Sequence, residues 1–218
     1  MGVMTSPASD SLKEITVRLD QRIQSVDEAR WLSSRYAAAD DRITLITLYA
    51  FYYELARVRL AVSDQTLGNI RFQWWRDALE ELKHGDIRQH DVVLALADQT
   101  GPGRLDVAEL LPLIDQHEEA FLTNDRSLEP EAALIKVAAG IFSDAIPVDE
   151  TLKDIAREWA SLRRSEVVET VLPRLRIDAA VRPAVGHFRL RHLWARKPDP
   201  SALQKRASVF IAMLTGRV

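Results

Sequence analysis

The chain has 218 residues, of which 47% are hydrophobic and 28% are charged, and its formal net charge is −3. These values are ordinary for a globular protein, and the small negative charge gives no general attraction to nucleic acid. The chain has no cysteine, which excludes disulfides, thiolate metal sites and a cysteine nucleophile. A chain of this length is expected to form a single helical domain, 1–218, with about residues 1–10 disordered.

Apolar residues recur at helical spacing, and no strand-like alternation runs long enough to compete with it. We therefore predict an all-α fold. A first helical region is expected over 11–36, broken near Ser25. The central helix is expected over 40–60, because its apolar residues go almost all the way round, which is typical of a helix surrounded by others. A stop at 63–64 and a turn at 66–68 follow. Further helices are expected over 69–84, 89–97, 106–121, 130–142, 149–171, 183–195 and 201–214.

The apolar segment 43–62 is about long enough to span a bilayer, but it contains Glu54, Arg57 and Arg59. Charges at that depth in a membrane cost several kcal/mol, so a buried core helix is the better interpretation. Residues 1–20 lack an apolar stretch and carry acidic residues early, so we expect neither a signal peptide nor a transit peptide. The expected location is the cytoplasm, with peripheral contact to the inner membrane left open.

Two charged residues of the central helix, Glu54 and Arg57, lie three apart and so share one helix face. A buried charge needs a partner. We expect Glu54 and Arg57 to pair with each other and with Arg71, Arg76 and Asp77 of the next helix. Two interpretations stay open: a structural ion network that fixes helix register, which we favour, and a polar pocket that holds an anionic group.

Two adjacent tryptophans lie between two arginines in the segment 71–76, where Arg71 and Trp75 lie four apart and share a face. In a ligand site, arginine would hold a diphosphate and tryptophan would line a groove of prenyl size. The alternative is a packing seam between helices. We take as candidate ligand-pocket residues Glu54, Arg57, Arg71, Trp75, Arg76 and Asp77. No residue is predicted to be catalytic or to bind a metal.

Motifs of other catalytic classes do not occur in the sequence. The histidines form no HExxH, and there is no P-loop, no GxGxxG and no local Ser-His-Asp signature. His117 stands beside Glu118 and Glu119, and we expect it to be solvated on a polar helix face. Asp40 and Asp41 are expected at the N-cap and in the first turn of the central helix.

Five segments resemble the squalene/phytoene synthase family, in the same order along the chain. RWLSSRYAAADDR (30–42) is similar to the family's opening segment, and LYAF (48–51) to the helix before its first aspartate motif. QWWRDAL (73–79) matches its tryptophan-arginine segment, LIDQHEE (113–119) a later stretch, and 159–173 faintly the second aspartate region. QWWRDAL after LYAF is the most specific likeness. The resemblance as a whole covers most of residues 1–150 and is weak afterwards.

The resemblance implies an isoprenoid-synthase-type helical bundle, shortened at the C-terminal side. Enzymes of this family condense two prenyl diphosphates with magnesium held by two aspartate-rich motifs, since Mg²⁺ prefers carboxylate oxygens. Here Ala56 and Arg57 stand at the paired-aspartate positions and Leu60 at the third acid, and the second region keeps only Glu166 and Glu169. The sequence ELARVR is similar to a divergent branch that includes a mitochondrial assembly factor for respiratory complex I.

The resemblance therefore implies a catalytically degenerate member, a pseudoenzyme that binds a prenyl lipid or a protein partner as a helper, with complex I assembly as one role and no cofactor. The alternative is an active prenyltransferase of isoprenoid biosynthesis that binds prenyl diphosphate through arginines in place of magnesium. In that case Arg57, Arg71 and Arg76 should point into one cavity. Magnesium enters as a cofactor only if the protein is an enzyme.

A third hypothesis is a membrane-surface scaffold with peripheral contact through 182–197. This segment is basic and carries Phe188, Leu190, Leu193 and Trp194, as an interfacial amphipathic helix does. A packed bundle helix is the favoured alternative for the same segment. A homodimer is left open, and no nucleic-acid partner is expected.

Overall fold

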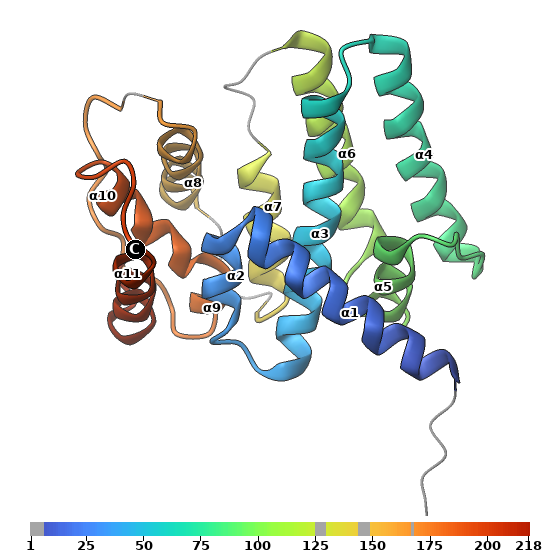
Figure 1. Cartoon of the computed structure of the whole chain (residues 1–218), viewed down its shortest axis with the longest axis horizontal. Helices are drawn as coiled ribbons and strands as arrows, with labels where there is room; N and C mark the ends of the chain where they lie inside the picture. The colour runs from blue at the N-terminus through green and yellow to red at the C-terminus, as the bar shows by residue number, and fades with distance from the viewer. Residues whose placement is uncertain (1–6, 125–129, 144–148, 167) are drawn as a thin grey trace, which may run out of the picture.

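The architecture is that of a computed structural model, which describes residues 7–124, 130–143, 149–166 and 168–218 (Figure 1). Within these ranges the chain is helical, and β pairing is limited to an isolated bridge between Arg176 and Arg217. The all-α prediction is confirmed. The elements are α1 Pro7–Val26, α2 Glu28–Ser34, α3 Ala39–Ala61, α4 Gln65–His84, α5 Asp91–Thr100, α6 Val107–Thr123, α7 Glu131–Gly140, α8 Glu150–Arg163, α9 Arg182–Val185, the 3₁₀ helix η1 Gly186–Arg189, α10 Leu190–Trp194 and α11 Ala202–Thr215.

Helix α3 is the central element, as its sequence predicts. It packs against α1, α2, α4, α5, α6 and α7, and Leu45, Leu48 and Leu55 are completely buried. Figure 1 shows α1 to α7 gathered around it, while α8, α10 and α11 lie on the other side of α2 and α9. None of the described helices is both long and apolar enough to cross a bilayer.

Helix α4 begins earlier than its sequence predicts. The turn expected at 66–68 is wrong, because Asp64 caps a helix that starts at Gln65: its side chain accepts a hydrogen bond from the Leu67 amide at 2.9 Å. Gly68 has a packing role instead. A Cβ at this position would lie 2.1 Å from the ring of Phe121, so the glycine lets α4 approach α6 closely.

The first turn of α3 carries Asp40 and Asp41, as expected, but the N-cap residue is Ala38, which makes no side-chain cap. Both carboxylates accept hydrogen bonds from Arg104, at 3.1 and 3.3 Å. At the other end of the chain, residues 1–6 of the segment expected to be disordered lie outside the described residues, and α1 begins at Pro7.

Two of the predicted helices in the C-terminal third are wrong in extent. Helix α8 ends at Arg163, and Ser165 has a φ of 60°, which breaks the expected helix over 149–171. The Leu172 amide then donates to the Glu158 carboxylate at 2.7 Å, so the chain turns back along α8.

The segment 183–195 is split among α9, η1 and α10, so the single amphipathic helix expected there is also wrong. Gly186 lets η1 pack closely against α11, because a Cβ at this position would lie 2.1 Å from the Met213 side chain of α11. Phe188 and Leu190 are fully buried. These two apolar side chains belong to the core and are not available to a membrane, although peripheral contact through 182–197 stays a prediction.

Candidate functional site

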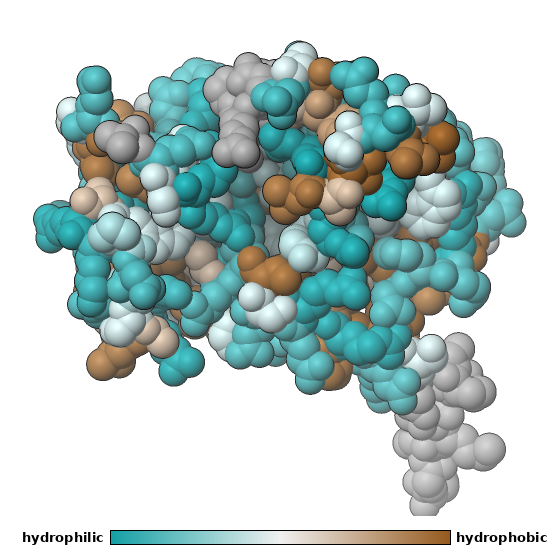
Figure 2. Space-filling view, turned by 45° about the horizontal axis from the view of Figure 1, so that its top comes forward, coloured by the Kyte–Doolittle hydropathy of each residue, from teal (hydrophilic) through white to brown (hydrophobic). Residues whose placement is uncertain are grey.

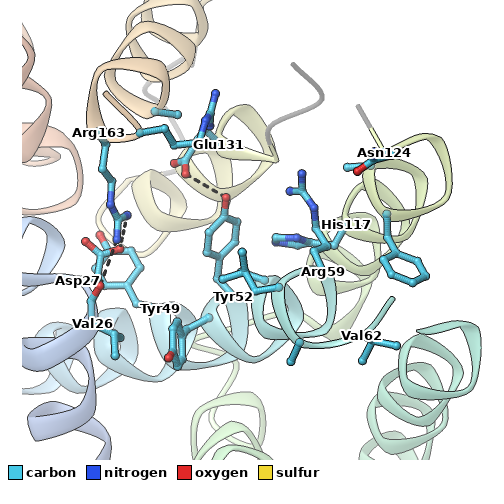
Figure 3. A pocket seen from close by; sticks show the side chains of 18 of the residues that line it. Val26, Asp27, Tyr49, Tyr52, Arg59, Val62, His117, Asn124, Glu131 and Arg163 are labelled. Atoms are coloured by element: carbon cyan, nitrogen blue, oxygen red, sulfur yellow. Dashed lines mark hydrogen bonds and ion pairs between the residues drawn. The ribbon is translucent and has the colours of Figure 1, made fainter. Parts of the chain in front are cut away.

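A large cavity lies beside α3, with a volume of about 1090 Å³. Its wall is made by α3 together with residues of α2, α6, α7 and α8 (Figure 3). The space-filling view shows a hollow near the centre of the face that it presents, with hydrophilic and hydrophobic side chains around it (Figure 2). This size is at the upper end of the range for small-molecule sites. The cavity is therefore the main candidate site.

One end of the cavity holds a fully paired cluster of charges around Arg30. The Arg30 guanidinium donates to Asp27 beside it and to Glu131 of α7. The Tyr52 hydroxyl donates to Glu131 at 2.9 Å, and Arg163 of α8 donates to Asp27 at 2.9 Å. Figure 3 shows the contacts between Asp27 and Arg163 and between Tyr52 and Glu131. The cluster ties α2, α3, α7 and α8 together.

The protonation of this cluster follows from its pairing. Burial alone would raise the pKa of Asp27, but the charges of Arg163 and Arg30 outweigh it and hold this pKa well below its ordinary value. Burial works to lower the pKa of Arg30, and the carboxylates of Glu131 and Asp27 raise it well above the ordinary value. The guanidinium of Arg30 also lies 4.7 Å from the Trp159 ring centre, a cation–π distance. The cluster is ionised and structurally saturated.

Toward the C-terminal end of α3, the cavity wall is formed by Ala56, Arg59 and Leu60. Arg59 has no hydrogen bond or ion pair in the part of the chain that the structure describes. Figure 3 shows its side chain beside that of His117 from α6. This end of the cavity thus presents an unpaired guanidinium next to an imidazole.

His117 is only 1% exposed, so the expectation of a solvated histidine is wrong. Helix α6 turns this residue inward, where its ring stacks edge-on with Tyr52 at 4.7 Å between centres. Neither ring nitrogen has a hydrogen-bond partner among the residues that the structure describes. Burial, together with the charges of Arg59 and Arg30, lowers the pKa of His117 well below its ordinary value, so the imidazole is neutral at pH 7.

A second, smaller cavity of about 250 Å³ lies on the opposite side of α3 and contains four of the candidate residues, Glu54, Arg57, Arg71 and Trp75. Glu54 accepts from Arg57 at 3.0 Å and from Arg22 of α1 at 2.7 Å. The ion pair therefore forms as predicted, but its further partner comes from α1 and not from α4, because α1 packs across this face of α3.

The other members of the candidate set lie apart. Arg71 is exposed and has no ion pair among the described residues, while Trp75 is buried against Phe51, with ring centres 5.3 Å apart. Arg76 donates to Asp115 of α6 at 2.7 Å and also to Glu118. Asp77 accepts from Gln73 at 2.7 Å.

Arg57, Arg71 and Arg76 therefore do not point into one cavity: Arg57 and Arg71 share the smaller one, and the carboxylates of α6 hold Arg76. Ligand binding by this set stays a prediction.

A search with protein-family models matches residues 23–135, more than half of the chain, to the squalene/phytoene synthase model. The chain belongs to the squalene/phytoene synthase family. The matched residues run from α1 to α7 and include every helix of the main cavity except α8. The cavity is therefore built largely from the family's shared region.

The similar curated proteins are named NADH dehydrogenase (ubiquinone) complex I, assembly factor 6. The Homo sapiens protein is 28% identical over 93 residues, the Bos taurus protein 27% and the Rattus norvegicus protein 31%. Each alignment covers 43% of this chain and 28% of the relative. The chain thus matches under a third of the length of these relatives. No solved structure matches at a significant level.

The magnesium ions used by enzymes of the squalene/phytoene synthase family do not fit the residues present. Ala56 and Leu60, at the positions where the resemblance places family aspartates, line the main cavity without an oxygen ligand. Its two carboxylates, Asp27 and Glu131, are both held by Arg30. Among the described residues, no group of three or more His, Asp or Glu side chains is placed to hold a metal ion. Glu166 pairs with Arg164 at 2.7 Å.

Sequence reasoning missed Arg59 and His117. The signal for Arg59 was present: it lies three residues after Ala56 and seven after Tyr52, spacings that place all three on one helix face. Arg57 is one residue beyond Ala56 and so faces the smaller cavity. For His117, the four-residue spacing from Leu113, which is fully buried, indicated an inward position.

Proposed function

We propose that this member of the squalene/phytoene synthase family is catalytically inactive and works as a binding protein, taking a prenyl lipid or a partner protein as an assembly helper. One observation carries the proposal. Ala56, Arg57 and Leu60 stand where the resemblance places the family's aspartates, and the two carboxylates among the described residues that line the cavity, Asp27 and Glu131, are both held by Arg30. Loss of the diphosphate leaving group depends on that metal in the family's enzymes.

The choice of an assembly helper is supported by the relatives, whose names describe a complex I assembly factor. Since the alignment reaches only 28% of those proteins, the role is proposed from the shared segment. The proposed client is a respiratory complex I subunit or subcomplex.

The test of inactivity is a turnover assay. The full chain is incubated with farnesyl or geranylgeranyl diphosphate and Mg²⁺, and released pyrophosphate is measured. We expect no release above a protein-free control. Release that disappears in an Arg57→Gln/Arg71→Gln double variant would instead support the prenyltransferase in which arginines replace the metal.

The assembly role has its own test. Deleting the gene in its native cell should lower NADH:ubiquinone oxidoreductase activity and leave assembly intermediates in native gels, and the wild-type gene should restore both. Unchanged complex I would remove the assembly role. A homodimer and peripheral membrane contact through 182–197 stay predictions, which sedimentation and flotation with anionic vesicles would decide.

A further inference from the structure

We propose that the main cavity binds, without a metal ion, an amphiphile with a single anionic head group, a phosphate monoester or a carboxylate, which Arg59 and His117 hold while the apolar wall takes the hydrocarbon chain. This inference rests on the proposed function and names the class of ligand that its cavity takes.

The unpaired positive charge in the cavity favours the binding of an anion. Among the described residues, four arginines and two carboxylates line it. Arg30 and Arg163 are matched by Asp27 and Glu131 within the cluster, and Arg164 is matched by Glu166 at 2.7 Å. Arg59 alone among these arginines has no carboxylate partner in the described part of the chain. A partly buried guanidinium favours an ionised acceptor, which it binds through two parallel hydrogen bonds.

His117 is the second, independent sign of a ligand. It is 1% exposed and both of its ring nitrogens lack a partner. A buried polar group without a hydrogen bond lowers stability, so native proteins rarely keep one without a use. The imidazole lines the cavity beside Arg59. As a neutral ring it can donate one hydrogen bond to an oxygen that the guanidinium also holds.

The walls next to this pair are apolar. Tyr53, Ala56, Leu60, Val62 and Phe121 line the cavity around Arg59, from α3, the residue after it, and α6. A volume of about 1090 Å³ leaves room for a chain of many carbons. An anion end beside a long apolar wall matches an amphiphile better than it matches a small polar metabolite.

Among the described residues that line the cavity, one cation is unpaired, and this number favours a ligand whose head carries one anionic group. A diphosphate carries more negative charge than one guanidinium balances, and in a partly buried site the excess would stay uncompensated. One guanidinium balances a carboxylate, and with a neutral donor it leaves less uncompensated charge on a phosphate monoester, which carries about −1.5 to −2 at pH 7, than on a diphosphate.

The experiment is calorimetric titration of the full chain in EDTA with dodecyl phosphate and with dodecanoate, each below its micelle concentration. We expect at least one of the two to bind, and 1-dodecanol, which has the same chain without the charge, to bind at least tenfold more weakly. Equal binding of the two anions identifies charge as the determinant, and preference for one identifies the head group. Binding of neither, or of dodecanol as tightly as the anions, overturns the proposal.

Variants localise the site. Arg59→Gln should weaken binding at least tenfold, and Ala56→Asp should do the same by placing a carboxylate one helix turn from Arg59, where the two neutralise each other. His117→Phe, which keeps the ring shape, should weaken binding a few-fold. Arg42→Gln is the matched control, since Arg42 lies on the same helix, is also partly exposed and without an ion pair among the described residues, and lines neither cavity; it should bind as the wild type does.

Unchanged affinity in Arg59→Gln overturns the proposal, as does binding that requires Mg²⁺. Thermal unfolding of each variant confirms that it is folded. Failure here is distinguishable from failure of the proposed function, because turnover of prenyl diphosphate is a separate measurement: a protein that binds no amphiphile in EDTA and releases no pyrophosphate loses only this inference.

Discussion

Two arginines line the same cavity under opposite conditions. Arg30 is 2% exposed and is enclosed by two carboxylates and by the rings of Tyr52 and Trp159. Arg59 sits farther along α3, partly exposed and without a partner among the described residues. The same side chain therefore serves structure in one place and is free for recognition in the other. Pairing, more than residue type, tells the two roles apart.

The largest effect on stability is expected from removing the Arg30 guanidinium from its ion cluster. Arg30→Met leaves Asp27 and Glu131 buried with one cation fewer, and removing one partner from a buried ion cluster typically costs about 3–5 kcal/mol. Urea unfolding should show a loss of this size in the free energy of unfolding. Arg57→Met is the control, because Arg57 is about half exposed and Glu54 keeps Arg22; it should cost under about 1 kcal/mol. Similar losses in both variants would contradict the structural role of Arg30.

The next largest effect on stability is expected from a change in the cavity wall near Arg59. Gly68→Ala brings a methyl group into the space of the Phe121 ring, and such overpacking costs about 1–3 kcal/mol. Because Phe121 lines the cavity, the displaced ring should also weaken binding of dodecyl phosphate. Gly103→Ala tests the alternative cause, since Gly103 has a positive φ and open space around it: it should lower stability through backbone strain alone and leave binding unchanged.

A pH effect of about 2 kcal/mol between pH 6.5 and 5 should report the buried imidazole beside Arg59, since one proton is worth about 1.4 kcal/mol per pH unit. Burial lowers the pKa of both His117 and His187 well below 6.5 in the folded state. The unfolded chain takes up these protons as the pH falls through about 6.5 while the folded chain does not, so stability decreases with falling pH in that range.

Urea unfolding at several pH values measures how the free energy of unfolding changes with pH. In His117→Phe, unfolding should take up about one proton fewer between pH 6.5 and 5, so the slope should be smaller. An unchanged slope in His117→Phe would mean that this ring is protonated in the folded protein. The stabilisation from Asp27, whose pKa is lowered, is lost only below about pH 4, outside this window.

The smallest effect is expected from Arg59 itself. Because its guanidinium has no partner to lose, Arg59→Gln should change the free energy of unfolding by no more than about 0.5 kcal/mol. The same variant should show the large loss of amphiphile binding. A destabilisation comparable with that of Arg30→Met would show that Arg59 is structural after all, and would remove the contrast between the two arginines.

Much of the helical order was predictable from the sequence, because local spacing decides it. The apolar ring of α3 and the periodic pattern of α11 locate both helices within a few residues. The end of α8 was not predictable in this way. It depends on Glu158, which accepts from the Leu172 amide and lies 3.0 Å from the buried Arg191, contacts that join separate parts of the chain.

The site was predictable only in part for the same reason. The pair Glu54–Arg57 is local, at a spacing of three, and its existence was correctly predicted. Arg30 meets Glu131 across 101 positions of sequence, a contact that no local pattern indicates. Arg59 lies between these cases, since its helix face was readable from Ala56 but its lack of a partner required the structure.

The position of Arg59 between Ala56 and Leu60 also bears on the history of this branch. A single substitution that restored an aspartate at 56 would put a carboxylate within reach of that guanidinium, and the new acid would form an ion pair before it met a metal. Magnesium binding would return only if the arginine were lost in the same lineage. We therefore expect that the change at this wall is not undone one residue at a time.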